Sequence, residues 1–209
     1  MPRSEQPKQE NQMEETGNKP EDSKDIGKDD RIEGKLLFKS RFVTIFGEIN
    51  DRSARAACER LIALSEESDA PIHVLISSPG GHVESGDAIH DIIRFVRAPV
   101  TTIGTGWVAS AGTHIFLAAP KDRRVCLPNT RFMIHQPGGG AGGQASDIAI
   151  HAKEILKTRE RIAREVSTET GQPLEKVMAD MERDFWMSAE EAVKYGIVSR
   201  VINHQKDLA

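Results

Sequence analysis

The sequence predicts an α/β fold, because short runs of β-branched and apolar residues alternate with longer segments whose apolar residues recur at helical spacing. The 209 residues also divide by composition, since residues 1–34 carry six Lys and Arg against ten Asp and Glu and hold few apolar side chains. Such a segment cannot bury enough surface to offset the entropy lost on ordering. We therefore expect a disordered acidic tail or propeptide over 1–34, one domain over 35–203 and a short C-terminal tail over 204–209.

Strands and helices are expected in turn along the first two thirds of the domain. Runs rich in Val, Ile, Phe and Thr predict strands over 41–49, 72–76, 100–104, 125–127 and 131–135, with a further strand near the end over 197–202. Between them, apolar residues at helical spacing predict helices over 52–66, 83–97 and 110–118.

The last third of the domain is expected to be mainly helical. A long helix is predicted over 146–169, and Pro173 is well placed to begin a short one. The segment from Ser188 to Glu191 has the pattern of a capping box, which predicts the start of a last helix. Gly196 would end that helix, since glycine tolerates the left-handed conformation common there.

Charge and cysteine content exclude several classes of function. The net charge of −4 lies entirely in residues 1–34, so the domain is neutral and lacks the cationic surface that nucleic acid binding needs. The uncharged stretch 99–120 contains several Gly and Thr and divides into a strand and a helix, so no membrane span is expected. Cys58 and Cys126 have neither metal-ligand spacing nor a disulfide pattern, and the acidic tail is not a secretory signal, so we expect a cytoplasmic protein.

Three residues offer the parts of an acyl-transfer site. Ser110 leads into a predicted helix, whose N-terminus can stabilise developing negative charge. A serine hydroxyl is a weak nucleophile and needs a base, and His135 at the end of an apolar run could provide it. Asp184 precedes Phe-Trp-Met, which would draw it toward the core. Serine, histidine and aspartate are the components of a catalytic triad.

Other residues compete for these roles. His114 lies four residues after Ser110, but two side chains one turn apart on one helix point alike and leave little room for a substrate between them. The remaining histidines on predicted helices, His90 and His151, are expected to be exposed. Asp180 and Asp147 are alternatives to the aspartate at position 184.

The glycine-rich run 138–143 formally fits a dinucleotide-binding pattern. A six-residue run with five glycines satisfies many patterns, and this one lies too late in the chain for the first strand–helix turn of such a domain. We expect no cofactor there.

These segments resemble the ClpP family, the proteolytic subunits of Clp proteases, over about residues 36–203. The matching runs include 131–137, 170–176 and 183–192. The resemblance implies a ClpP/crotonase-like fold of stacked ββα units with a projecting handle helix. It also implies a serine endopeptidase that cleaves peptides and unfolded proteins inside a ring-shaped chamber, with no metal or organic cofactor.

For individual residues, the resemblance implies a Ser110, His135 and Asp184 triad and an oxyanion hole from the amides of Gly81 and Ala111.

The resemblance also implies partners. Two stacked rings of seven copies are expected, with Gln136 and Arg183 coupling ring contacts to the triad. An AAA+ unfoldase could feed the chamber, although residues 1–35 do not resemble the family's axial segment. Two alternatives stay open, a catalytically silent ring subunit and an acyl-CoA enzyme on the related crotonase fold.

Overall fold

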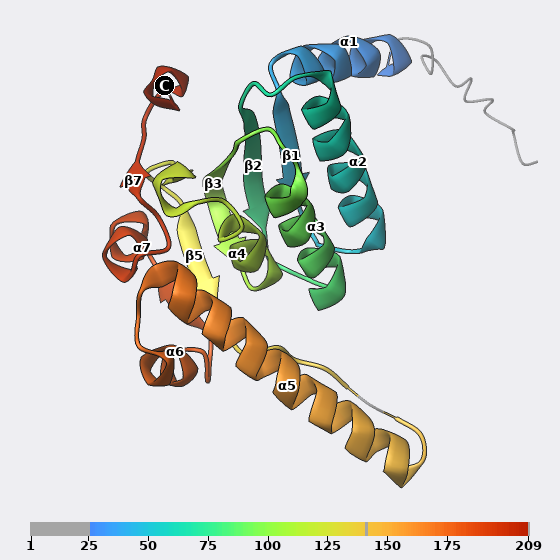
Figure 1. Ribbon diagram of the computed structural model, residues 1–209, viewed down its shortest axis with the longest axis vertical. Coiled ribbons are helices and arrows are strands. Elements are labelled where there is room, and N and C mark those ends of the chain that lie inside the picture. The colour runs from blue at the N-terminus through green and yellow to red at the C-terminus, as the bar shows by residue number, and fades with distance from the viewer. Residues whose placement is uncertain (1–25, 141, 209) are drawn as a thin grey trace, which may run out of the picture. The chain divides into compact units, whose positions relative to one another are not determined.

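The computed structural model describes residues 26–140 and 142–208 (Figure 1). Its α-helices are α1 (Ile26–Lys39), α2 (Asp51–Glu67), α3 (Val83–Phe95), α4 (Ala111–Phe116), α5 (Ala145–Thr170), α6 (Leu174–Asp180) and α7 (Ala189–Tyr195). Its strands are β1 (Phe42–Phe46), β2 (Ile72–Ser78), β3 (Val100–Ala109), β4 (Arg124–Cys126), β5 (Arg131–Ile134), β6 (Phe185–Met187) and β7 (Arg200–Val201). Among the helices described, none combines the length and the apolar character that crossing a membrane requires.

The part of the chain from Leu36 onward is built on a seven-stranded sheet with the order β1-β2-β3-β4-β7 and a branch through β5 and β6. All neighbouring strands run parallel except β5 and β6, which are antiparallel. Helix α2 packs on β1 and β2, and α3 packs on both α2 and α4 (Figure 1). Parallel strands joined by helices are the expected outcome of the alternating sequence pattern.

Strand β3 is the branch point of the sheet. Its first half pairs with β4, from Thr102 to Gly104, and its second half pairs with β5, from Trp107 to Ala109. Between the two halves, Gly106 has φ +59, a left-handed conformation that glycine adopts without strain. The strand therefore changes partner within its own length, which brings its carboxyl end beside that of β5.

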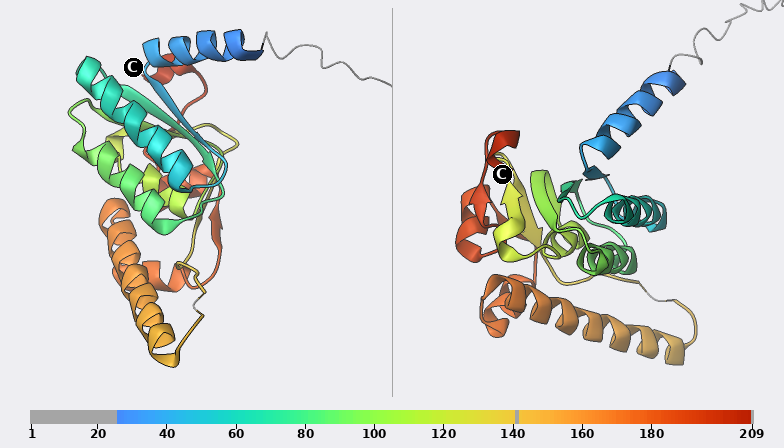
Figure 2. Two further views of the ribbon diagram at one scale, coloured as in Figure 1. Left: turned by 90° about the vertical axis from the view of Figure 1, so that its right-hand side faces the viewer. Right: turned by 45° about the horizontal axis from the view of Figure 1, so that its top comes forward.

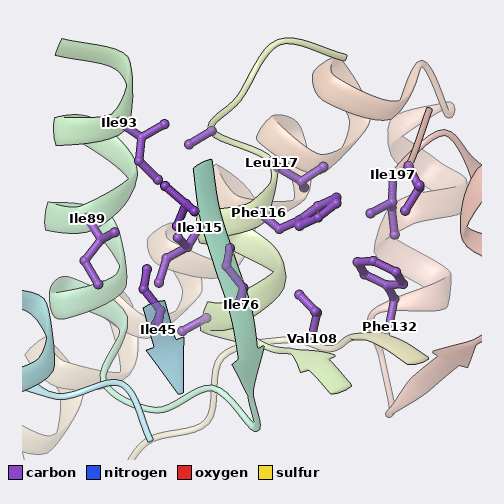
Figure 3. Packing of buried hydrophobic residues seen from close by; sticks show 14 of the residues in the cluster. Ile45, Ile76, Ile89, Ile93, Val108, Ile115, Phe116, Leu117, Phe132 and Ile197 are labelled. Atoms are coloured by element: carbon purple, nitrogen blue, oxygen red, sulfur yellow. The ribbon is translucent and has the colours of Figure 1, made fainter. Parts of the chain in front are cut away.

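The core lies between the sheet and the helices α3 and α4. Ile45 and Ile76 from the strands meet Ile89 from α3 and Ile115 from α4, and all are buried (Figure 3). Inward-facing residues recur every second position in strands and every three or four in helices, so each element presents one apolar face to the others. This packing fixes α4, the short helix that follows β3.

Helix α5 has two different halves. Its N-terminal half, residues 145–154, is exposed and extends away from the sheet, as the views in Figure 1 and Figure 2 agree. Its C-terminal half is held, with Ala163, Val166 and Thr170 buried. There the fully buried Arg124 of β4 donates to the Glu169 carboxylate and, at 2.9 Å, to the Glu169 carbonyl.

Sequence signals at the helix ends correspond to real caps. Ser188 and Glu191 form a reciprocal capping box at the start of α7, and Gly196 ends that helix with φ +99. A Cβ at Gly196 would lie 2.3 Å from the Thr170 carbonyl oxygen, so this position also requires glycine for space. The predicted α/β fold and these caps are confirmed.

Several boundaries differ from the prediction. Strand β3 continues to Ala109, well beyond the predicted end at 104, because its second half finds a partner in β5 that local sequence does not reveal. The last strand is only Arg200–Val201, since the amides of Ile197 and Val198 bond to the end of α7 instead. Strand β6 is absent from the sequence prediction.

The expected acidic tail is described only in part. Residues 26–34, predicted to be disordered, belong to α1, which continues through the apolar Leu37 and Phe38. Extending a helix from an existing turn costs little even for polar residues. Residues 1–25 lie outside the described part of the chain, so the division at 34, 35 and 203 stays a prediction.

Candidate active site

The candidate catalytic residues flank three adjacent strands. Ser110 directly follows β3, His135 directly follows β5 and Asp184 directly precedes β6. Strands β3 and β5 are parallel, so their carboxyl ends meet at one edge. Because β6 runs antiparallel to β5, with Phe185 opposite Ile134, the start of β6 lies at that same edge. The branch of the sheet through β5 and β6 therefore assembles all three residues.

Their side chains form one chain of hydrogen bonds. The hydroxyl of Ser110 donates to His135 Nε2 at 2.8 Å, and His135 Nδ1 donates to Asp184 Oδ1 at 2.9 Å. The side chains of His135 and Asp184 are 31% and 62% exposed in the single chain. A base within hydrogen-bond reach of a hydroxyl, itself oriented by a carboxylate, is the geometry that activates a serine nucleophile.

The backbone at Ser110 is under strain. Its φ of +54 and ψ of −122 are unusual for a residue with a side chain, and they turn the chain sharply from β3 into α4. Gly80 packs directly against this turn, where a Cβ would lie 2.6 Å from the Cβ of Ser110. Strained backbone held by close packing is common at functional sites.

Two backbone amides lie near the serine. Ala111 is the first residue of α4, where the amide has no partner within the helix. Gly81 follows Gly80, which packs against the serine. Its position requires glycine, because φ is +147 and a Cβ there would lie 2.2 Å from the Ile49 oxygen. The Ile49 amide donates to the Gly80 carbonyl, and the Ile49 carbonyl accepts from the His82 amide. The amide of Gly81, between these two residues, is therefore left for another acceptor.

Gln136 and Arg183 differ in their contacts. The backbone amide of Gln136 donates to the Met181 carbonyl at 2.6 Å, and its side-chain amide donates to the Glu182 carbonyl at 2.9 Å. These bonds tie the loop after His135 to the loop before β6. Arg183 is exposed, and within the described part of the chain no ion pair or hydrogen bond of its side chain is found.

An apolar pocket of about 30 Å³ opens beside the serine. Its walls include Val83, Ile134, Ile162 and Met181, which come from α3, β5, α5 and the segment after α6. A pocket of this size next to a nucleophile admits only a small apolar group of a substrate.

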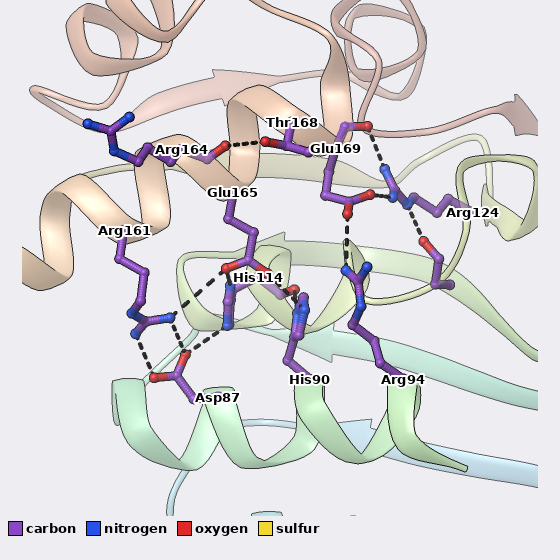
Figure 4. A network of polar contacts seen from close by, with 11 residues as sticks. Asp87, His90, Arg94, His114, Arg124, Arg161, Arg164, Glu165, Thr168 and Glu169 are labelled. Atoms are coloured by element: carbon purple, nitrogen blue, oxygen red, sulfur yellow. Dashed lines mark hydrogen bonds and ion pairs between the residues drawn. The ribbon is translucent and has the colours of Figure 1, made fainter. Parts of the chain in front are cut away.

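His90 does not lie where the sequence suggested, and it packs beside His114. His90 is buried at 4% exposure, so the prediction that it is exposed is wrong. It packs against His114, with ring centroids 4.4 Å apart, because α3 and α4 face each other. His114 points toward Asp87 and Glu165 (Figure 4), and it also contributes to the lining of the pocket beside Ser110.

The buried histidines belong to a charged network that sequence reasoning missed. Burial alone would lower the pKa of His90, but the hydrogen bond and charge of Glu165 raise it above its ordinary value. Burial would likewise raise the pKa of Glu165, yet the hydrogen bond from His90 and the surrounding positive charges lower it. The sequence signal was weak, because the three residues lie on separate helices with no common spacing.

A second serine, histidine and aspartate grouping lies nearby. Ser85 Oγ donates to Asp51 Oδ1 at 2.6 Å, and His82 Nδ1 lies 2.8 Å from the same Oγ. Glu84 lies 3.0 Å from His82 Nε2, but the proton of the Ser85 hydroxyl is directed to Asp51 and not to the histidine. The order of bonds therefore suits a structural contact at the start of α3 better than a nucleophile.

Comparison with known proteins gives a consistent family. The family model described as Clp protease matches residues 28–205. ATP-dependent Clp protease proteolytic subunit 3 of Rhizobium etli is 55% identical over 172 residues, covering 82% of this chain and 89% of that protein. Subunit 2 of Gluconobacter oxydans is 58% identical over 179 residues, covering 85% of this chain and 80% of its own length.

Solved structures agree with the fold. ClpP1 from Listeria monocytogenes superposes with a TM-score of 0.77 at 46% identity, covering 84% of this chain and 99% of that one. A point mutant of the same Listeria protein gives a TM-score of 0.79 at 48% identity, with coverage of 84% and 98%.

Proposed function

The chain belongs to the Clp protease family and is a protease, and we propose that Ser110 is its nucleophile, His135 its general base and Asp184 the carboxylate that orients the base. The observation that carries this proposal is the unbroken hydrogen-bond chain from Ser110 through His135 to Asp184.

The reaction proceeds by acyl transfer. The Ser110 oxygen attacks the carbonyl carbon of a peptide bond while its proton moves to His135 Nε2. Asp184 accepts the hydrogen bond from Nδ1 throughout, which fixes the tautomer and stabilises the imidazolium. The imidazolium then gives its proton to the leaving amine, so the C–N bond breaks and an acyl ester remains on Ser110. Water, deprotonated by His135, hydrolyses the ester and restores the serine.

The negative charge of the tetrahedral intermediate needs donors on the carbonyl side. We assign these to the amides of Gly81 and Ala111, as the family resemblance implies. The glycine lets the backbone approach the substrate closely, and the second amide lies at the N-terminus of α4, where helix amides point toward an anion. Each step described here uses only groups of this chain, the substrate and water.

We propose peptides and unfolded proteins as substrates. Because the relatives are subunits of ATP-dependent Clp proteases, we propose that copies of this chain assemble into two stacked rings of seven and accept substrate from an AAA+ unfoldase. The exposed N-terminal half of α5 suits the contact between rings, since Ile148 and Ile150 there, and Leu156 just beyond it, are exposed apolar residues. Gln136 and Arg183 would couple that contact to the triad.

Covalent labelling tests the assignment directly. A peptidyl phosphonate or a β-lactone that reacts with activated serines is incubated with the assembled protein, and the modified peptide is identified by mass spectrometry. We expect one adduct per chain, on Ser110, and its loss in His135→Ala, because the hydroxyl then lacks a base.

The same experiment addresses the alternatives. A ring subunit without catalytic function would leave the serine unlabelled although the rings form. An acyl-CoA enzyme would process thioesters and fail to hydrolyse a fluorogenic peptide. Labelling of another serine would show that the nucleophile is assigned wrongly.

A further inference from the structure

Three helices bring metal-binding side chains together in the interior of the domain. His90 comes from α3, His114 from α4 and Glu165 from α5 (Figure 4). Each residue offers a ligand atom within 4.8 Å of the other two. Their side chains are only 5%, 6% and 20% exposed. None of the three residues belongs to the chain of hydrogen bonds that joins Ser110, His135 and Asp184.

His90 has hydrogen-bond acceptors beside both of its ring nitrogens. Its Nδ1 lies 2.9 Å from the carbonyl oxygen of His114, and its Nε2 lies 2.8 Å from Glu165 Oε1. A neutral imidazole carries one N–H, and the carbonyl uses it. The lone pair on Nε2 then faces a carboxylate, which is unfavourable unless a proton or a metal ion lies between them.

The ring of His114 is less constrained. Its Nε2 lies 2.8 Å from Asp87 Oδ1 and its Nδ1 lies 3.5 Å from Glu165 Oε2. Neither contact has the direction of a hydrogen bond, so both buried nitrogens lack a proper partner among the described residues. Buried ligand atoms that converge without hydrogen-bond direction are the arrangement that side chains adopt around a cation.

The surrounding charge and space also suit a cation. A hollow of about 290 Å³ is lined by the three residues together with Asp87, Asp91 and Arg161. With both imidazoles neutral, three carboxylates face one guanidinium, which leaves two negative charges. Arg161 is bonded to both oxygens of Asp87, at 3.1 and 2.6 Å, and its contact with Glu165 is longer, at 4.0 Å.

We propose that His90 Nε2, His114 Nδ1 and the Glu165 carboxylate bind a divalent transition metal ion of the zinc class. Two histidines and a carboxylate are a common zinc ligand set, with bonds of about 2.0–2.2 Å. The carbonyl of His114 then orients His90, and Asp87 faces the second nitrogen of His114, as carboxylates do behind metal-bound histidines. The fourth position falls in the hollow, which has room for water.

Metal binding requires a small movement. The two rings are nearly parallel, at 15°, and the lone pair of an imidazole lies in the plane of its ring. One ion can bind both rings only if one ring tilts. His114 is the ring that tilts, because His90 is held by the bond to the His114 carbonyl while the ring of His114 has no directed hydrogen bond among the described residues.

The bound ion would join three parts of the fold. Helix α4 begins directly after Ser110, and α5 carries the exposed half that suits the contact between rings. A metal that ties both helices to α3 therefore stabilises the elements beside the active site. Its expected role is structural, since none of its ligands takes part in the hydrogen bonds that join Ser110, His135 and Asp184.

Zinc binding to the full-length assembled protein is the test. Protein stripped with a chelator and carrying His135→Ala, which removes the catalytic imidazole as a competing ligand, is dialysed against dilute zinc and its metal content is measured. We expect one zinc per chain. We also expect cobalt to give the visible absorption of a four-coordinate ion with nitrogen and oxygen ligands, a readout independent of any further variant.

Matched variants locate the ion. Glu165→Gln and His90→Ala should each lower zinc affinity by more than about 100-fold, and Asp87→Asn by about 10–100-fold. The exposed histidine variants His151→Ala and His204→Ala should leave it unchanged. Absence of stoichiometric zinc and of the cobalt spectrum would overturn the proposal and leave a proton on His90. Zinc retained in full by both Glu165→Gln and His90→Ala would overturn it as well.

Discussion

The protein contains two histidine–carboxylate sites that differ in their surroundings. His135 and Asp184 lie at the edge of the sheet, with side chains 31% and 62% exposed. His90 and Glu165 lie between helices, with side chains 5% and 20% exposed. In the open site the second imidazole nitrogen meets a hydroxyl, which can give up its proton. In the buried site the second nitrogen meets a backbone carbonyl, which has no proton to give.

This comparison shows that pairing a histidine with a carboxylate does not by itself make a catalytic base. The group at the other nitrogen and the access of substrate decide the role. We therefore expect changes in the open site to affect catalysis and leave stability alone, and changes in the buried site to do the reverse.

The largest effect is expected for the nucleophile and its base. Ser110→Ala and His135→Ala should each lower kcat/KM for a fluorogenic peptide by about three to six orders of magnitude, because triad members act as a unit. The double variant should be no slower than either single one. Thermal melting should stay near that of the wild type. Substantial peptidase activity in the Ser110→Ala protein would rule out the proposed nucleophile.

Asp184→Asn should follow, with a loss of about four orders of magnitude in kcat. An asparagine amide can donate to Nδ1, which favours the tautomer whose Nε2 carries the proton and cannot accept one from Ser110. Asp147→Asn is the control, since this exposed aspartate is an alternative by sequence alone and should be silent. Equal losses in the two variants would mean that the orienting carboxylate is misassigned.

For the buried site, Glu165→Ala should lower the free energy of unfolding by about 3–5 kcal/mol, because it leaves a buried histidine without its ion-pair partner. Glu160→Ala, on the same helix, is the control, because its exposed pair with Arg164 should contribute less than about 1 kcal/mol. Both are measured by denaturation with a chelator present, so that no metal contributes. If the Glu165 variant melts like the Glu160 variant, the network is not a source of stability.

Arg183→Ala should change assembly. Arg183 is exposed in the single chain, and its proposed role is a contact between copies. Truncation of an interface arginine commonly costs more than about 1 kcal/mol, or at least about fivefold in the association constant. Assembly measured by sedimentation and peptidase activity measured on the same samples should fall together. Intact rings with wild-type activity would exclude a coupling role.

The smallest effect is expected for removal of residues 1–34. Their removal should shift the melting temperature by less than about 2–4 °C, the change that 1 kcal/mol produces in a domain of this size. The acidic, apolar-poor composition of this segment is the reason. A larger drop would show that part of it packs on the domain.

Local sequence determined most of the elements and offered candidates for the catalytic residues. The capping box at Ser188, the glycine at 196 and the apolar periodicity of α2, α3 and α5 act over a few residues, so their signals survive without tertiary context. Local patterns offered Ser110, His135 and Asp184 beside competitors such as His114, Asp180 and Asp147, and the family resemblance selected among them. Their assembly into a working site stays a prediction, which the hydrogen-bond distances between the three side chains support.

Tertiary structure alone decided how the strands branch and which buried groups meet. The second half of β3 and all of β6 exist because β5 lies between them, and the pairing of β5 with β6 spans about fifty residues that no local pattern connects. From sequence alone His90 is predicted to be exposed, because nothing in its own helix requires its burial. It is buried because α4 and α5 cover that face and provide Glu165, and only the packing of three separate helices makes burial of its charge favourable.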